Sequence, residues 1–204
     1  MEKLLSIIIP TYNMSLYIER CMNSLISSKT IEKLDIIVVN DGSKDDSSEK
    51  AKNIAISYPN SIRVIDKENG NYGSCINTGL KLAKGKYIKI LDADDLFDTH
   101  NLENVLDIIK ELDVDMILTD FKMAYSNGKS KLRSFISQRG AKPGFNFYSR
   151  LYFQGFHTSL DAFSHVQNKY SSEHQLPSNG RNLLYRPRMD IYSIGICSKH
   201  LLYP

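Results

Sequence analysis

The chain has 204 residues, of which 42% are hydrophobic and 24% charged, an ordinary composition for a folded, soluble globular protein. No run approaches the roughly 18 to 20 apolar residues of a membrane helix, and the apolar run 4–9 stops at Pro10, too early for a secretory signal core. We therefore expect a cytoplasmic chain. Cys21, Cys75 and Cys197 are odd in number and far apart, which indicates neither a disulfide framework nor a zinc site.

Charge is divided unevenly along the chain. Residues 1–120 carry 14 Lys/Arg against 20 Asp/Glu, whereas residues 121–204 carry 12 against 3. Two interpretations of the basic part stay open: a solubilising surface, or a surface that faces an anionic partner such as a phosphate-bearing substrate or a membrane.

Apolar, β-branched runs alternate with segments of helical periodicity over the first 120 residues. Strands are expected at 4–9, 34–39, 62–65, 87–91 and 115–121. The apolar helical faces are expected to carry two sets of residues: Leu16, Ile18, Cys21, Met22, Leu25 and Ile26, and then Leu102, Val105, Leu106, Ile109 and Leu112. This βαβ series predicts an α/β fold with a mostly parallel central sheet and helices on both faces. Residues 121–204 predict only a mixed, less regular region.

Three polar clusters follow strands of this series: PTYN at 10–13, NDGSKDDS at 40–47 and DADD at 92–95. Each by itself is explained by a turn or a helix cap, and Asp98 or Thr99 would cap the helix after the third cluster. The carboxyl ends of parallel strands lie at one edge of a sheet, where such folds bind ligands. The three clusters together therefore favour a ligand site.

The second cluster has the chemistry to recognise a uracil base. The Asp41 carboxylate would accept from the N3–H of uracil, while a backbone N–H or hydroxyl near Thr11 meets a carbonyl of the base. Tyr12 offers an aromatic face on which a base would stack.

The third cluster places four carboxylates within seven residues, Asp92, Asp94, Asp95 and Asp98, where they repel one another. On an extended segment, side chains two residues apart point to the same side, so Asp92 and Asp94 would face one cavity. Their hard oxygen ligands suit Mg²⁺ or Mn²⁺, which proteins hold through one or two carboxylates together with substrate phosphates and water.

The segments LLSIIIPTYN, LDIIVVNDGSKDDS and NYGSCINTGLKLAKGKYIKILDADD, with their spacing, resemble the nucleotide-binding half of family 2 inverting glycosyltransferases of the GT-A fold. The resemblance covers residues 4 to about 120. It implies a single GT-A (Rossmann-like) domain, in which residues 1–120 form the nucleotide-sugar-binding half and residues 121–204 the basic acceptor-side region.

The resemblance also implies roles for particular residues. Pro10, Thr11, Tyr12 and Asp41 match the nucleotide contacts, Asp92 lies near the ribose, and Asp94 binds the metal that bridges the two phosphates. Gly73, Asn77, Gly79 and Gly85 match the family's glycine and asparagine pattern. The departures are Asn40, where many members carry a second acid, and Ser74 and Cys75, where many carry a small residue and a basic one.

The general base that an inverting transfer needs is not assignable from the sequence. After residue 120 the acids are Asp161, Glu173 and Asp190, and none belongs to an acid pair of the kind typical of the family. The chain also ends at Pro204, short for the family, which leaves open a version with an incomplete acceptor site.

The expected function is transfer of a sugar from a UDP-sugar donor to a glycan or lipid-linked acceptor in bacterial cell-surface polysaccharide biosynthesis. We expect a divalent metal, Mn²⁺ or Mg²⁺, peripheral contact with the inner face of the membrane through the basic region, and no nucleic-acid partner. Two alternatives stay open: a nucleotide-sugar-binding fragment without transferase activity, and a haloacid dehalogenase-type phosphatase with Asp92 as nucleophile and Asp94 as acid.

Overall fold

The computed structural model describes residues 2–27, 29–113, 116–119, 121–124, 129–133, 145–148 and 195–198. The helices are α1 (Ile18–Asn23), α2 (Ser47–Ile56), α3 (Asn71–Leu82) and α4 (Thr99–Glu111), with a short 3-10 turn η1 (Ile31–Lys33). The strands are β1 (Leu5–Thr11), β2 (Leu34–Asn40), β3 (Ile62–Asp66), β4 (Tyr87–Ile90), β5 (Met116–Thr119), β6 (Phe121–Ala124), β7 (Ser130–Arg133), β8 (Phe145–Tyr148) and β9 (Gly195–Ser198).

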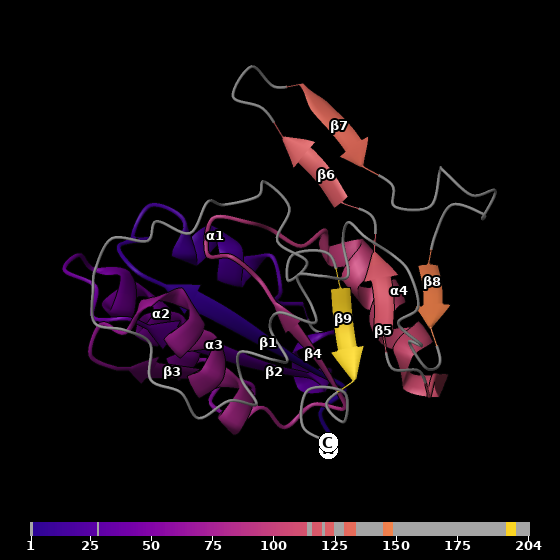
Figure 1. Ribbon diagram of the computed structural model, residues 1–204, viewed down its shortest axis with the longest axis horizontal. Helices are drawn as coiled ribbons and strands as arrows, with labels where there is room; N and C mark the ends of the chain where they lie inside the picture. The colour runs from indigo at the N-terminus through magenta and orange to yellow at the C-terminus, as the bar shows by residue number, and fades with distance from the viewer. Residues whose placement is uncertain are drawn as a thin grey trace, which may run out of the picture.

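The main sheet has seven strands in the order β3-β2-β1-β4-β9-β5-β8 (Figure 1). The first four are parallel, and β9 lies antiparallel to both β4 and β5. In the central register Thr11 pairs with Asn40 and Ile8 with Ile90, so β1, β2 and β4 end at the same edge. The predicted α/β fold with its parallel sheet is confirmed.

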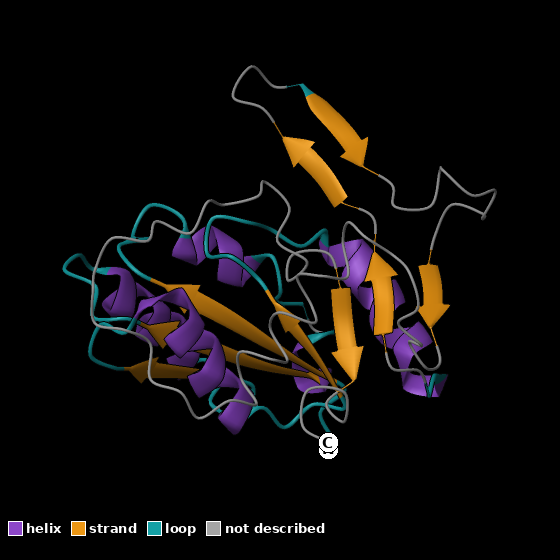
Figure 2. Ribbon diagram, in the orientation of Figure 1, coloured by secondary structure: helices purple, strands orange, loops and turns teal. Residues whose placement is uncertain are grey.

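Helices cover both faces of the parallel strands, as Figure 2 shows. On one face, Leu5, Ile7 and Ile9 of β1 pack with buried residues of α1, α2 and α4. On the other face, Ile8 packs with α3. The alternation follows from the two-residue period of a strand, which sends successive side chains to opposite faces.

The contact between α3 and β1 requires a glycine. A Cβ atom added at Gly79 would lie 2.4 Å from Cγ2 of Ile8, far inside van der Waals contact. Gly79 therefore allows α3 to lie close against the centre of the sheet, which brings the first residues of α3 to the edge where β1 and β2 end.

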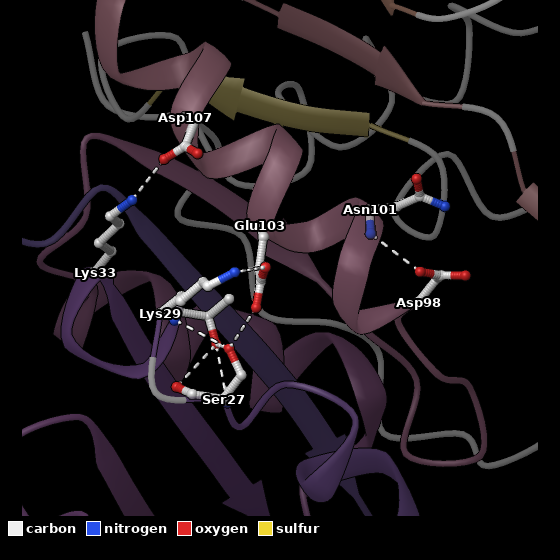
Figure 3. Close-up of polar contacts among 8 residues, drawn as sticks. Ser27, Lys29, Lys33, Asp98, Asn101, Glu103 and Asp107 are labelled. Carbon is white, nitrogen blue, oxygen red and sulfur yellow. Dashed lines mark hydrogen bonds and ion pairs between the residues drawn. The ribbon is translucent and has the colours of Figure 1, made fainter.

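The helix α4 follows the acidic third cluster and is fastened to the segment before β2 by polar contacts (Figure 3). Lys29 and Ser27 both contact Glu103, at 3.3 and 3.1 Å, and Lys33 lies 2.7 Å from Asp107. The apolar face of α4 is buried as predicted, through Leu102, Val105, Leu106 and Ile109, with Leu112 partly buried against the same core. α4 is thus held against the core and against the segment before β2.

Two details of the predicted elements are wrong. Leu16, expected on an apolar helical face, is 84% exposed, because the amides of Tyr17 and Ile18 both bond to the carbonyl of Met14 and make a turn before α1 begins. The single strand predicted at 115–121 is two strands: β5 pairs with β8 and β9 in the main sheet, whereas β6 pairs with β7 in a separate hairpin. The partners of β5 are remote in sequence, whereas β6 pairs with the nearby β7, and a local pattern does not reveal the distant partners of β5.

None of the described helices has the length and hydrophobicity to cross a membrane.

Candidate functional site

The ends of β1 and β2 meet around Asp41, directly after β2. The amide of Asp41 donates to the carbonyl of Thr11 over 2.8 Å. Its side chain is 4% exposed, and Oδ1 accepts from Lys67 Nζ at 2.6 Å and from the Gly70 amide at 2.9 Å. Burial by itself raises the pKa of Asp41, but the hydrogen bonds from Lys67 and Gly70 outweigh it, and the pKa is lowered. Asp41 is therefore an ionised carboxylate held at the edge of the sheet.

The loops after β1 and β2 are tied together beside this acid. The amide of Asn13 donates to Ser43 Oγ at 3.0 Å, and the Asn13 side chain accepts from the Lys44 amide at 2.8 Å. Tyr12 projects from the first of these loops and is 45% exposed. Its aromatic face is accessible, as base stacking requires, and the stacking stays a prediction.

Pro10 and Thr11 are buried, and they form the last two residue pairs of β1 with β2. The Thr11 hydroxyl donates to the carbonyl of Ile9 at 3.1 Å. Since that hydroxyl already has an internal acceptor, a contact with a base carbonyl near Thr11 falls to a backbone N–H.

Asn40, one of the expected departures from the family pattern, has a structural role here. Its Nδ2 donates to Asp66 at 2.8 Å, and its Oδ1 accepts from the hydroxyl of Ser43. Hydrogen bonds from Lys52, then Ser48, lower the pKa of Asp66 to about 2, with Asn40 adding to the effect. Asn40 therefore joins the ends of β2 and β3, and Asp41 keeps its predicted position without a second acid beside it.

The acidic cluster follows β4, on the other side of β1. The carboxylate of Asp92 accepts a 2.7 Å hydrogen bond from the Tyr72 hydroxyl, and its carbonyl accepts from the Asp95 amide at 3.0 Å. Arg20 of α1 donates to the carbonyl of Asp94 at 3.3 Å. Residues 92–95 thus form a turn and not the expected extended segment, so strand geometry does not place the Asp92 and Asp94 side chains on one side. The contacts fix the backbone of the cluster from α1 and one carboxylate from α3.

Electrostatic repulsion within the cluster is visible in Asp95. Burial raises the pKa of Asp95, and the negative charges of Asp92 and Asp94 raise it further. A cation placed between these carboxylates would relieve that repulsion.

The donor set fits a hard divalent metal. Within the part of the chain that the structure describes, no group of three or more His, Cys, Asp or Glu side chains could hold a metal ion. Asp92 and Asp94 would therefore hold Mn²⁺ or Mg²⁺ only together with oxygen atoms of a bound ligand and water, which is the usual arrangement for these ions.

Asp98 caps a helix, a role that the sequence left open for it. Its side chain accepts from the amide of Asn101 at 3.0 Å and caps the start of α4 (Figure 3). The predicted helix cap is confirmed, and it separates Asp98 from the predicted ligand pair.

The remaining predicted residues lie in and after α3. Gly73 and Asn77 are partly buried residues of that helix. Gly79 and Gly85 belong to the packing of the fold, because a Cβ atom on either would lie 2.4 Å from Ile8 or from the backbone of Ser6. Two of the four pattern residues are thus explained by close packing.

Lys67, Gly70 and Tyr72 donate to carboxylates of the predicted acids and were not among the predicted site residues. All three lie in or beside the segment ENGNYG, directly after β3. Its position at the end of a third strand was the available signal, since that strand ends at the same edge as β1 and β2.

Two buried thiols lie behind the same acids. Burial, followed by the charges of Asp95, Asp94 and Asp92, raises the pKa of Cys21 to about 12. Burial and the charge of Asp41 raise the pKa of Cys75 to about 12 as well. Both cysteines are free, as predicted, and both stay protonated thiols at neutral pH.

A comparison with protein-family models identifies the family of this chain. The model described as glycosyl transferase family 2 matches residues 6–167. The chain belongs to glycosyl transferase family 2. The predicted family is thereby confirmed, and the dehalogenase-type alternative falls away.

Curated relatives agree with family 2. The chain is 42% identical over 110 residues to an uncharacterized glycosyltransferase of Rickettsia felis. This match covers 54% of this chain and 18% of that protein. It is 36% identical over 126 residues to the minor teichoic acid biosynthesis protein GgaB of Bacillus subtilis. This second match covers 61% of this chain and 14% of GgaB. The chain therefore spans less than a fifth of the length of either relative in these matches.

A solved structure supports the GT-A fold of this family 2 chain. The mannosyltransferase PcManGT of Pyrobaculum calidifontis, in complex with GDP-Man and Mn²⁺, aligns with a TM-score of 0.52 at 24% identity. The alignment covers 60% of this chain and 36% of the mannosyltransferase. At this level of identity the similarity concerns the fold.

Proposed function

We propose that this family 2 protein transfers a sugar from a UDP-sugar donor to a glycan or lipid-linked acceptor. The observation that carries the proposal is the common edge of β1, β2 and β4, where an ionised Asp41 and the Asp92–Asp94 pair lie on either side of β1. The two sites follow β2 and β4, which lie two strand spacings apart, or roughly 10 Å. A ligand that reaches both sites must therefore be extended. A nucleoside diphosphate has that length, with a base at one end and phosphates at the other.

Asp41 is suited to the base. The hydrogen bonds from Lys67 and Gly70 both end on Oδ1, and the Cys75 thiol is a further donor to this carboxylate. Because each carboxylate oxygen can accept two hydrogen bonds, Oδ2 keeps acceptor capacity for the N3–H of uracil. Cytosine has an unprotonated N3 and would be repelled by an ionised Asp41. Because the side chain is 4% exposed, the contact is limited to the edge of a planar base, with Tyr12 beside it.

Asp92 and Asp94 are suited to the diphosphate end. A divalent metal bound there would act as a Lewis acid that stabilises the negative charge on the leaving diphosphate. The chain's own contribution is to hold the Asp92 carboxylate through Tyr72 and the backbone of Asp94 through Arg20.

We further propose an inverting reaction, in which a general base takes the proton of the acceptor hydroxyl during one in-line displacement. The base would come from the acceptor-side region, residues 121–204. Its acids, Asp161, Glu173 and Asp190, lie outside the described residues.

The acceptor is proposed to be a cell-surface glycan or its lipid-linked precursor. The name of GgaB, a minor teichoic acid biosynthesis protein, supports a surface polymer as the product. The basic region 121–204, with 12 Lys/Arg against 3 Asp/Glu, supports a cytoplasmic protein that binds the anionic inner face of the membrane. Sedimentation with anionic and with neutral vesicles tests the membrane contact, and equal binding to both would contradict it.

Calorimetry tests the donor. UDP, GDP and CDP are titrated into the full chain with and without Mn²⁺, GDP being included because PcManGT was solved with GDP-Man. We expect UDP to bind most tightly, and more tightly with Mn²⁺. Binding of none of the three would overturn the proposed function, and preferential binding of GDP would overturn the choice of uridine. Binding of UDP without turnover of any UDP-sugar would favour the binding-fragment alternative.

A further inference from the structure

The start of α3, from its N-cap Gly70 to Tyr72, connects the two acidic sites of the sheet edge. The Gly70 amide donates to Oδ1 of Asp41 at 2.9 Å, and two residues later the Tyr72 hydroxyl donates to Oδ1 of Asp92 at 2.7 Å. Asn71 between them has a φ of 70°, the left-handed conformation that asparagine tolerates better than most residues. One short segment thus contacts an acid at the end of β2 and another beyond the end of β4.

Asp92 is held at both its backbone and its carboxylate. The backbone carbonyl accepts from the Asp95 amide at 3.0 Å and lies 3.7 Å from the Cys21 sulfur. The carboxylate is held by Tyr72. A carboxylate rotates about its last bond in a broad, roughly two-fold potential, so a hydrogen bond on one oxygen selects the orientation of the other.

Asp94 differs from Asp92 in this respect. Its backbone carbonyl is held by Arg20 at 3.3 Å, but no hydrogen bond from a described residue reaches its carboxylate. The two acids of the pair are therefore unequal before any ligand binds: one carboxylate is oriented by the fold, and the other is left to a ligand.

We propose that Tyr72 is a positioning residue for the donor site, and that it acts through Asp92. By occupying Oδ1, the Tyr72 hydroxyl turns Oδ2 of Asp92 toward the bound nucleoside diphosphate and its metal, and its partial positive charge lowers the cost of keeping Asp92 beside Asp94 and Asp95. This role rests on the proposed function. It does not require Tyr72 to touch the donor.

The side chain of Tyr72 is 39% exposed, so loss of its hydroxyl removes a hydrogen bond without opening a cavity in the core. Tyr72→Phe is therefore a clean test. The matched control is Tyr58→Phe, which also removes one phenolic hydroxyl, because Tyr58 precedes β3 at the opposite edge of the sheet.

The experiment is a double-mutant cycle on the affinity for UDP in the presence of Mn²⁺, measured with the full chain. The four proteins are the wild type, Tyr72→Phe, Asp92→Ala and the double variant. We expect Tyr72→Phe to weaken binding about tenfold in the wild-type background, the scale of a hydrogen bond to a charged group. We expect no further weakening in the Asp92→Ala background, where its acceptor is absent.

Two results would overturn the inference while the proposed function stands: no loss of affinity for Tyr72→Phe, or the same loss in both backgrounds, which would mean that Tyr72 contacts the ligand directly. If the wild type binds no UDP, the proposed function fails and the inference falls with it. The Tyr58→Phe control is expected to bind like the wild type.

A second measurement needs no ligand. Urea unfolding of the same four proteins gives the coupling between Tyr72 and Asp92 in the free protein. We expect the effects of the two substitutions on the unfolding midpoint to be non-additive. Additive effects would show that the hydrogen bond does not hold Asp92 before the ligand arrives, and would overturn the inference independently of nucleotide binding.

Discussion

Lys67 Nζ lies 2.6 Å from Oδ1 of Asp41, and this ion pair joins the end of β3 to the end of β2 at the centre of the proposed base site. The Asp41 side chain is 4% exposed and that of Lys67 is 20% exposed, so the pair is largely removed from water. Removal of one partner should therefore cost more than it would at the exposed ion pairs on α4, because it leaves a buried charge without compensation.

We predict that Lys67→Met destabilises the protein by about 2 kcal/mol, because it leaves a buried carboxylate with one charged partner fewer. Urea unfolding at neutral pH measures the change. The exposed Lys81 of α3 provides the control, and Lys81→Met should leave stability close to that of the wild type. A Lys67→Met variant as stable as the control would contradict the account of Asp41.

Acid sensitivity should depend on Asp66. Its pKa of about 2 in the folded protein lies below its ordinary value, so the ionised form stabilises the fold. This contribution is present above the unfolded pKa and is lost as the pH falls through the folded one. Asp66→Asn should therefore be less stable than the wild type at neutral pH, and the difference should shrink from about pH 5 to about pH 2. Urea midpoints at several pH values measure it, and a constant difference would refute the prediction.

Alanine substitutions at Asp94 and Asp98, four residues apart, should have opposite effects: one on UDP binding and the other on stability. Asp94→Ala is predicted to abolish Mn²⁺-dependent UDP binding with little change in stability. Asp98→Ala removes the α4 cap and should cost about 1 kcal/mol of stability while binding persists. Calorimetry and thermal unfolding on both variants make each the control of the other. Greater loss of binding in Asp98→Ala would reverse the assignment within the acidic cluster.

Close packing of α3 on β1 should also be measurable. A Cβ at position 79 would lie 2.4 Å from Cγ2 and 2.8 Å from Cγ1 of Ile8, so Gly79→Ala must displace α3. We expect a loss of about 2 kcal/mol, the usual scale of overpacking. The Ile8→Ala substitution removes the clashing atoms, so the double variant should lose less than the sum of the two single effects. Additive losses in urea unfolding would show that the two residues do not clash.

Local patterns suffice to predict the alternation of strands and helices in the first 120 residues, because the periods of apolar residues are local and most strand residues there are buried. The sequence also placed the polar clusters at the ends of strands and identified Asp98 as a candidate cap, since capping depends on residues three apart. The family could be inferred from the same segments, and the family model confirms it.

The tertiary structure alone decided which groups contact the acids. Lys67 reaches Asp41 across 26 residues and Tyr72 reaches Asp92 across 20, contacts that depend on how α3 lies over the sheet. It likewise decided that β9 lies between β4 and β5, and that the strand expected at 115–121 divides between two sheets. The pairings of β9 with β4 and β5 join residues far apart in the chain, and their energy comes from partners that no local pattern specifies.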